Sequence, residues 1–447
     1  MKQEQNKMAV MPMSKLILNM SLPLMASLLI QSLYNIVDSI FVARLSEDAL
    51  TATSLAFPLQ LLTIAVGVGT SVGVNAVMSR SVGEKDYTKT GEIATTGILL
   101  ALVATLVFIV IGFTCVPYFV SIFTQDQMIG EYCVQYLSIC LIFCVGSFLS
   151  TMYQRFLQAV GNAFDSMLSL IAGAVTNLIL DPIMIFGLLG FPALGIRGAA
   201  IATVLGQCVS AVLAILLNKF RNPMVVPVCK GYRLEKAILV RIYKVGLPTI
   251  ITQALGSVMV SAFNGILMPF SATAVAFFGV YYKLQSFLFM PMNGMGQAMI
   301  PIVGFNRGAN DLGRIKSAIR TVLPFAIGIA FVMTGIFLIF PKQLLLLFAP
   351  SEELLAIGVP ALRIIAPTFV FASVSMMLGY SVSGLGIGIV NMLATALRQF
   401  LVLIPLAYFL VACFGVGKVW YAIWAAELCA FAYAFFHTRR LLKKNGI

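Results

Sequence analysis

The stretch Ala174-Val-Thr-Asn-Leu-Ile-Leu-Asp-Pro-Ile-Met-Ile-Phe-Gly187 decides the fold, because it places a carboxylate inside an apolar run long enough to cross a bilayer. Asn177 precedes Asp181 by four residues, so both side chains lie on one helical face. Pro182 follows directly and removes a backbone donor. A carboxylate at this depth costs about 2.5–3.5 kcal/mol on insertion scales, so it indicates a functional site. The structural alternative is an acid that only pairs helices.

The composition indicates a polytopic membrane protein. Of the 447 residues, 60% are hydrophobic and 10% are charged, and the mean hydropathy is +1.00, which excludes a water-soluble globule. The eight cysteines mostly lie in apolar runs without a CxxC motif, so they predict neither a disulfide framework nor a zinc site. The net charge of +13 comes from bases in short loops and at the C-terminus, which indicates membrane topology rather than nucleic-acid binding.

Windows of about 20 apolar residues predict an all-α protein with twelve transmembrane helices. The predicted spans are 15–44, 49–79, 92–116, 131–155, 165–188, 196–218, 242–269, 273–300, 318–340, 354–380, 389–412 and 417–438. The first run is too long for a signal peptide and lacks a cleavage site, so we expect it to be retained. The loops and helix ends on the side of the termini collect 23 Lys and Arg, including Arg155 and Arg398, against 4 on the other side. The positive-inside rule therefore predicts cytoplasmic termini.

The two halves of the chain resemble each other. A polar stretch at the midpoint predicts a cytoplasmic linker at 221–241, between a six-helix N-lobe at 1–220 and a six-helix C-lobe at 242–447. A shift of 225 residues matches Leu22-Pro23 with Leu247-Pro248 without a gap. Since six spans separate equivalent helices, the lobes are expected to be related by a pseudo-two-fold axis along the membrane normal, with a central cleft between them.

Three acids lie inside apolar runs: Asp38, Asp181 and Glu427. The first ends a polar stripe on one helix face, formed by Gln31, Tyr34, Asn35 and Asp38. Asp38 and Asp181 are expected at similar depth in the outer half of the membrane, where they can meet. Their C-lobe counterparts are Phe263 and Ile404, so the carboxylate pair belongs to the N-lobe alone. Such a pair could exchange protons or bind sodium, and the residues leave both open.

Glu427 is a separate case, because no second acid accompanies it in the C-lobe. Arg398 or Lys283 could pair with it. We favour structural pairing over a direct role in transport for Glu427.

Four segments carry a family pattern. They are Leu22-Pro23 with Tyr34-Asn-Ile-Val-Asp38, the segment from Val72 to Asp86, its counterpart from Pro301 to Asn310, and Thr176-Asn-Leu-Ile-Leu-Asp-Pro182. Together they resemble the multidrug and toxic compound extrusion (MATE) family, in its prokaryotic form, over nearly the whole chain. The resemblance implies a secondary active antiporter that expels cationic or amphipathic compounds in exchange for H+ or Na+ by alternating access, with no enzymatic activity and no cofactor.

The resemblance also implies a cation-coupling site in the N-lobe. Its residues would be Tyr34, Asp38, Asn177, Asp181 and Thr203. If sodium is the coupling ion, it would bind at Asp38, Asn177 and Asp181. Some family members carry a further acid in the seventh, eighth or tenth helix. Those helices contain none here, which argues against a second sodium site in the C-lobe.

Further expectations concern the cleft and its surroundings. The residues expected to line a substrate cleft are Gln31, Asn35, Gln253, Gln285 and Glu427. Pro23 is expected to bend the first helix and to gate the cleft. The expected partners are small cationic or amphipathic molecules and the lipid bilayer. We expect a monomer in a bacterial plasma membrane, with both termini cytoplasmic.

Two other functions compete with drug efflux. A flippase for lipid-linked precursors would share the two-lobe plan, but a pyrophosphate would need a more basic cavity than this acidic N-lobe offers. An intramembrane aspartyl protease could use two aspartates. Such peptidases show adjacent Tyr-Asp and a Gly-x-Gly-Asp motif, whereas Tyr34 and Asp38 are four apart and Gly384-Leu-Gly386 is followed by Ile387.

Overall fold

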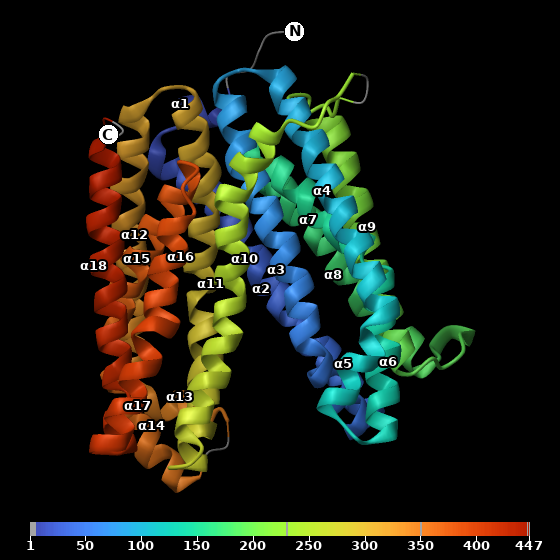
Figure 1. The fold of residues 1–447 in the computed structure, drawn as a ribbon, viewed down its shortest axis with the longest axis vertical. Helices are drawn as coiled ribbons and strands as arrows, with labels where there is room; N and C mark the ends of the chain where they lie inside the picture. Colours follow the sequence, from blue (N-terminus) through green and yellow to red (C-terminus); the bar gives the residue numbers. More distant parts are fainter. Residues whose placement is uncertain (1–5, 229–230, 349–350, 445, 447) are drawn as a thin grey trace.

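The computed structural model describes residues 6–228, 231–348, 351–444 and 446, and within these ranges every regular element is a helix. The first half contains α1 (Lys7–Val10), α2 (Met13–Leu45), α3 (Glu47–Gly83), α4 (Tyr87–Thr114), α5 (Val116–Phe123), α6 (Gln127–Ile142), α7 (Val145–Ala159), α8 (Ala163–Phe186), η1 (Leu188–Gly190) and α9 (Ile196–Arg221). The second half contains α10 (Lys236–Leu267), α11 (Ala272–Gly308), α12 (Leu312–Ile339), α13 (Pro341–Leu346), α14 (Glu352–Ile365), α15 (Thr368–Gly384), α16 (Ile389–Ala396), η2 (Leu397–Leu401), α17 (Leu403–Phe414), η3 (Val416–Lys418) and α18 (Tyr421–Lys444). The halves form two bundles side by side, and both chain ends lie at the same end of the molecule (Figure 1).

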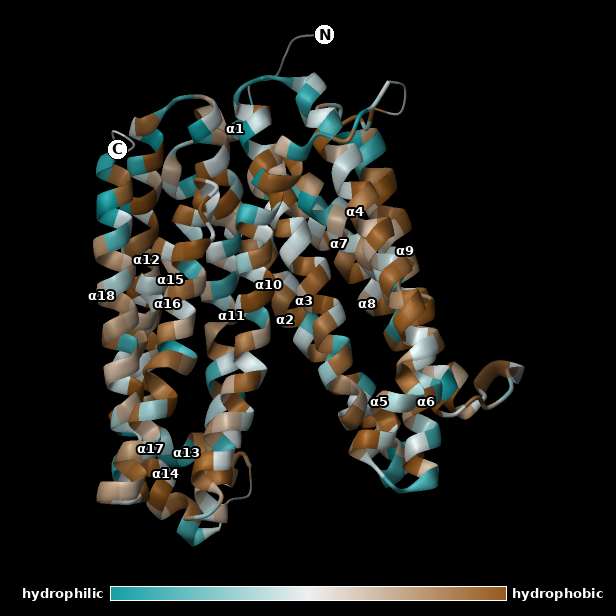
Figure 2. Cartoon of the chain, in the orientation of Figure 1, coloured by the Kyte–Doolittle hydropathy of each residue, from teal (hydrophilic) through white to brown (hydrophobic). Residues whose placement is uncertain are grey.

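The helices account for the twelve predicted spans. Among the described residues, nine helices are long and apolar enough to cross a membrane, and two bent pairs add two more spans. The twelfth span is α11, which is 37 residues long, as is its counterpart α3. Unlike α3, it carries Lys283, Gln285 and Gln297 along its length. Apolar residues dominate the middle of the bundles, and hydrophilic residues gather at both ends (Figure 2). The predicted all-α membrane fold is confirmed.

Three predicted spans are interrupted rather than straight. The span predicted at 131–155 is α6 and α7, bent by 47°, and the span at 354–380 is α14 and α15, bent by 51°. Pro367 caps α15, so its missing backbone donor falls at the second break. The span at 389–412 contains the π-helical turn η2 between α16 and α17. Such turns inside helices are frequent at functional sites.

The helix caps repeat with the 225-residue shift found in the sequence. Side-chain caps lie at Ser46 and Ser271 before α3 and α11, and at Asp86 and Asp311 before α4 and α12. These residue types are the preferred N-caps, because their oxygens accept from free backbone N–H groups of the first turn. Lys85 and Asn310, also related by the shift, both have a left-handed backbone, with φ of 59° and 57°. The repeat is therefore visible in local geometry as well as in sequence.

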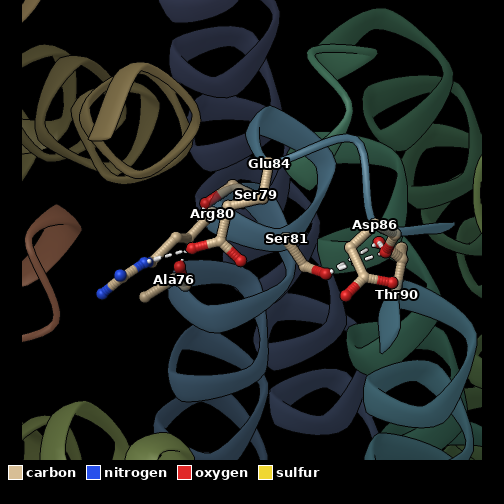
Figure 3. Close-up of polar contacts among 7 residues, drawn as sticks. All are labelled: Ala76, Ser79, Arg80, Ser81, Glu84, Asp86 and Thr90. Atoms are coloured by element: carbon tan, nitrogen blue, oxygen red, sulfur yellow. Dashed lines mark hydrogen bonds and ion pairs between the residues drawn. The ribbon is translucent and has the colours of Figure 1, made fainter. Parts of the chain in front are cut away.

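The turn between α3 and α4 is fixed by short hydrogen bonds (Figure 3). Ser81 Oγ donates to the carbonyl oxygen of Asp86 over 3.0 Å, and Thr90 Oγ1 donates to the same oxygen over 2.8 Å. On the other side of the turn, Arg80 Nε lies 2.9 Å from Glu84 Oε1. These contacts satisfy groups left free at the helix ends and hold α4 antiparallel to α3.

The lobes meet through close helix crossings that require glycine. A Cβ on Gly73 of α3 would collide with the carbonyl oxygen of Ile242 on α10. Gly83 and Gly308 make a symmetric crossing of α3 and α11, where a Cβ on either would collide with the backbone of the other helix. Small residues let membrane helices approach in this way. These crossings lie toward the end with the termini, whereas the two bundles diverge at the opposite end (Figure 1).

The connection between the lobes packs against α4. It leaves α9 after Arg221, and α10 begins at Lys236, so residues 236–241 of the predicted linker are helical. The backbone of Val228 exchanges two hydrogen bonds with Thr95 Oγ1, over 2.9 and 3.0 Å. Residues 229–230 of the predicted linker lie outside the described residues.

Candidate functional site

The two N-lobe aspartates predicted to meet do lie together. Asp38 is on α2 and Asp181 on α8, and their carboxyl groups are within side-chain hydrogen-bonding reach. Asp181 is fully buried and Asp38 is partly buried. The helices α2 and α8 pack against each other, so the similar depth expected from the sequence becomes a direct contact.

Asn177, Thr203 and Tyr34 surround the pair. Asn177 Nδ2 donates to Asp181 Oδ1 over 3.1 Å and lies 3.4 Å from Thr203 Oγ1 on α9. Tyr34 lies one turn before Asp38 on α2, and its side chain interacts with both aspartates and with Gln31, one turn earlier. All five residues predicted for cation coupling are therefore gathered on α2, α8 and α9.

One oxygen of each carboxyl group lacks a hydrogen-bond donor. Asp38 Oδ1 and Asp181 Oδ2 are buried, and no donor group among the described residues reaches them. Two ionised carboxylates cannot hydrogen-bond each other, because both only accept. Two ionised carboxylates this close would repel each other, so a proton shared between them or a cation bound to them would stabilise the arrangement.

A cavity of about 300 Å³ adjoins the pair. Tyr34, Asn177 and Thr203 line it, together with Gln31, which was predicted for the substrate cleft. Gln253 on α10 also lines it, so the C-lobe contributes to its wall. We call this space the N-lobe cavity.

The wall of the N-lobe cavity that α7 forms was not predicted from the sequence. Its lining residues recur every three or four positions and form one helix face: Ser147, Ser150, Thr151, Gln154, Arg155 and Gln158. Arg155 was assigned to a cytoplasmic helix end. It does lie near the end of α7 at Ala159, but its side chain is only 7% exposed and lines the cavity. The spacing of polar residues within 147–158 was the signal that could have located it.

A second cavity, also about 300 Å³, lies in the C-lobe and contains the remaining buried acid. Glu427 on α18 is 4% exposed, and Arg398 Nε on the π turn lies 3.9 Å from its Oε1. Arg398 is thus not at a helix end as the charge count assumed, and the pairing of Glu427 with Arg398 is present. Glu427 Oε2 is buried without a donor among the described residues. Gln285 and Gln253 line this C-lobe cavity too.

The last two predicted residues lie elsewhere. Asn35 is exposed and lines neither cavity, although it lies one helical turn after Gln31 on the same polar stripe of α2. Pro23 lies inside α2, which is helical without a break from Met13 to Leu45, and its carbonyl oxygen accepts from Ser27 Oγ over 2.9 Å. The gating role of Pro23 stays a prediction.

Comparison with known proteins places this geometry in a family. The family model described as MatE matches residues 23–183 and 248–409, two segments that begin 225 residues apart. The multidrug export protein MepA of Staphylococcus haemolyticus is 26% identical over 425 residues, covering 94% of this chain and 92% of the relative, and MepA of Staphylococcus aureus strain NCTC 8325 is 27% identical over 429 residues with the same coverage. A solved structure described as the outward-facing conformation of a multidrug resistance MATE family transporter has the same fold, with a TM-score of 0.91, 24% identity and 99% of both chains covered. The chain therefore belongs to the MatE family of multi-pass membrane transporters.

Proposed function

We propose that this chain is a secondary active multidrug efflux antiporter that expels cationic or amphipathic compounds in exchange for H+ or Na+. The contact between Asp38 and Asp181 carries the proposal, because it places a site for one cation beside a cavity with walls from both lobes. The staphylococcal relatives, which are described as multidrug export proteins, support the substrate class.

The proposed cycle follows from the two states of the pair. A proton or sodium ion lowers the charge of the pair from −2 to −1 and contacts the two oxygens that lack donors, so the occupied pair allows α2 and α8 to stay in contact. The empty pair is negatively charged, repels itself and attracts a cationic substrate. Ion and substrate therefore favour different states of one lobe, and their binding is coupled without shared atoms.

The proposed placement is a bacterial plasma membrane, with a monomer whose two termini are cytoplasmic. Both termini lie at one end of the molecule (Figure 1). Removing Arg155 and Arg398, which line cavities, from the charge count leaves 21 Lys and Arg on that side against 4, so the support from the positive-inside rule persists.

Transport of a lipid-linked pyrophosphate is less well supported. Only two cations, Arg155 and Arg398, are among the described lining residues of the cavities, and Arg398 already faces Glu427. One unpaired guanidinium per molecule offers little for a group that carries at least two negative charges. Family membership likewise supports a transporter over a protease.

The test is transport in proteoliposomes with proton and sodium gradients imposed separately. Vesicles containing the purified protein and a fluorescent organic cation receive either a pH gradient at equal sodium or a sodium gradient at equal pH. We expect one gradient to drive uptake, and the matching ionophore to abolish it. Asp38→Asn should bind the dye but not respond to either gradient. A wild-type protein indifferent to both gradients would refute the antiport.

A further inference from the structure

A basic surface lies on the C-lobe at the end of the molecule that bears the termini, where the last turns of α18 are hydrophilic (Figure 2). Exposed Lys and Arg side chains come from the last turns of α18 and from the first turns of α12: Arg439, Arg440, Lys443, Lys444, Lys316 and Arg320. We call these six residues the C-lobe basic face. The ion pairs among the described residues include none of the six. The acid at this end of α12, Asp311, already accepts from the backbone N–H of Arg314 as the helix cap.

The two helices that form the C-lobe basic face are neighbours. Both α12 and α18 pack against α15. A Cβ on Gly446, just after α18, would lie 3.6 Å from Leu312 Cδ1 at the start of α12. The start of α12 and the end of α18 also lie at the same end of the molecule (Figure 1). Their charges therefore contribute to one positive surface.

On each helix the basic residues continue into exposed apolar side chains. On α18, Phe436 is 65% exposed and precedes Arg440 by four residues. On α12, Phe331 is 62% exposed and follows Arg320 by eleven residues. Residues four or eleven apart lie on one side of an α-helix, because eleven residues make about three turns. The bases thus lie on the faces of α12 and α18 that point to the surrounding lipid.

The depth of the C-lobe basic face matches the layer of lipid headgroups. The 28 residues of α12 are about 42 Å long, whereas the apolar core of a bilayer is about 30 Å thick. A centred helix therefore leaves about 6 Å at each end for the headgroup layer. Lys316 lies about 6 Å from the start of α12, and Arg440 lies about as far from the end of α18. Long cationic side chains at this depth extend toward the phosphate groups.

The matching surface of the N-lobe is covered by protein. The 225-residue shift relates Lys316 to Gly91 and Arg320 to Thr95, both on α4. A Cβ on Gly91 would collide with the backbone of the connection between the lobes, and Thr95 Oγ1 exchanges hydrogen bonds with that connection. In the C-lobe the same two positions carry long exposed cations. This position is therefore suited to an anionic partner from outside the chain.

We propose that the C-lobe basic face binds the headgroup of an anionic phospholipid. The phosphate accepts charge-assisted hydrogen bonds from the guanidinium and ammonium groups, and the acyl chains lie along the exposed apolar faces of α12 and α18. The positive-inside rule accounts for a surplus of bases on one side of the membrane, but not for their concentration at one edge of one lobe. The proposal does not rest on the proposed antiport.

The experiment measures lipid binding to purified full-length protein in detergent by native mass spectrometry. Separate titrations use phosphatidylglycerol, which carries one negative charge, and zwitterionic phosphatidylcholine with the same acyl chains. Each gives the Kd of the first bound lipid. Two double variants remove charge from one helix at a time: Lys316→Gln with Arg320→Gln, and Arg439→Gln with Arg440→Gln. All four residues are exposed, so the variants should fold.

The matched control is Lys85→Gln with Lys89→Gln, which removes two charges from the turn between α3 and α4, where Glu84 and Asp86 accompany them. We expect each C-lobe double variant to weaken phosphatidylglycerol binding by about 5- to 30-fold, because each Lys or Arg near an anionic surface contributes about a fivefold factor. The control should change this binding by less than about twofold, and phosphatidylcholine binding should change by less than about twofold in every variant.

Three results would overturn the proposal. They are equal affinity of the wild type for the two lipids, equal losses in the control and the C-lobe variants, and no loss in either C-lobe variant. Displacement of phosphatidylglycerol by inorganic phosphate at constant ionic strength would identify free phosphate as the ligand and would also overturn it. Transport is not measured, so each of these results leaves the proposed antiport standing.

Discussion

Replacing Asp181 by Asn tests the coupling site most directly, because the new side chain has the same shape but cannot carry a proton or a negative charge. Its Oδ1 can still accept from Asn177, as Asp181 Oδ1 does over 3.1 Å. Its Nδ2 can donate to Asp38, whose Oδ1 lacks a donor among the described residues. The variant should therefore fold and keep α2 and α8 in contact, as an occupied site does.

The expected loss can be given a magnitude. On the proposed mechanism, the two carboxyl groups in contact take up one proton or one sodium ion per cycle. For electroneutral exchange with a monovalent substrate, a tenfold ion gradient, about 1.4 kcal/mol, then sustains at most about a tenfold substrate gradient. In Asp181→Asn the substrate concentrations on the two sides of the membrane should become about equal, because the site no longer binds the driving ion.

The assay is dye accumulation in proteoliposomes at a fixed tenfold gradient of the driving ion. The matched control is Asp165→Asn, which lies on the same helix, is 3% exposed and pairs with Arg221 over 3.0 Å. This control should lose thermal stability but hold the dye gradient. If correctly folded Asp181→Asn still held a gradient above about threefold, the assignment of coupling to the pair would be refuted.

Three further outcomes are expected. Glu427→Gln should lower expression or change substrate preference, since it leaves the partly buried Arg398 without its partner at 3.9 Å. The ion dependence of transport should stay as in the wild type, and its loss would assign coupling to the C-lobe. Pro23→Ala restores a backbone donor inside α2, so the transport turnover should slow more than substrate binding weakens. A variant whose turnover in vesicles equals that of the wild type would show that Pro23 does not gate the cleft. Arg314 on α12 donates to the backbone carbonyl oxygens of Met8 and Met11, over 3.0 and 2.8 Å. Arg314→Ala should therefore speed hydrogen exchange in residues 6–12, and unchanged exchange would show that these bonds do not stabilise the segment.

Much of the coupling site could be predicted because helical periodicity fixes which side chains share a face. Asn177 and Asp181 had to lie together, as did Tyr34 and Asp38, once each run was recognised as a helix. Span direction and residue rise then gave both aspartates a similar depth. The same reasoning placed Asn35 on the polar stripe, but it cannot tell which edge of a stripe faces a cavity, and Asn35 is exposed.

By itself the sequence determined the spans, the two-fold repeat and the caps, because these depend on local composition and on residues close together in the chain. The 225-residue shift thus reappears in the caps at Ser46 and Ser271. Only the tertiary structure decided that α2 lies against α8, that Arg155 turns inward to a cavity and that Arg398 reaches Glu427 from a π turn. The physical reason is that a long cationic side chain near the end of an apolar run can extend to the membrane surface or into the bundle. Which of these it does depends on the neighbouring helices, whose packing arises from contacts distant in sequence.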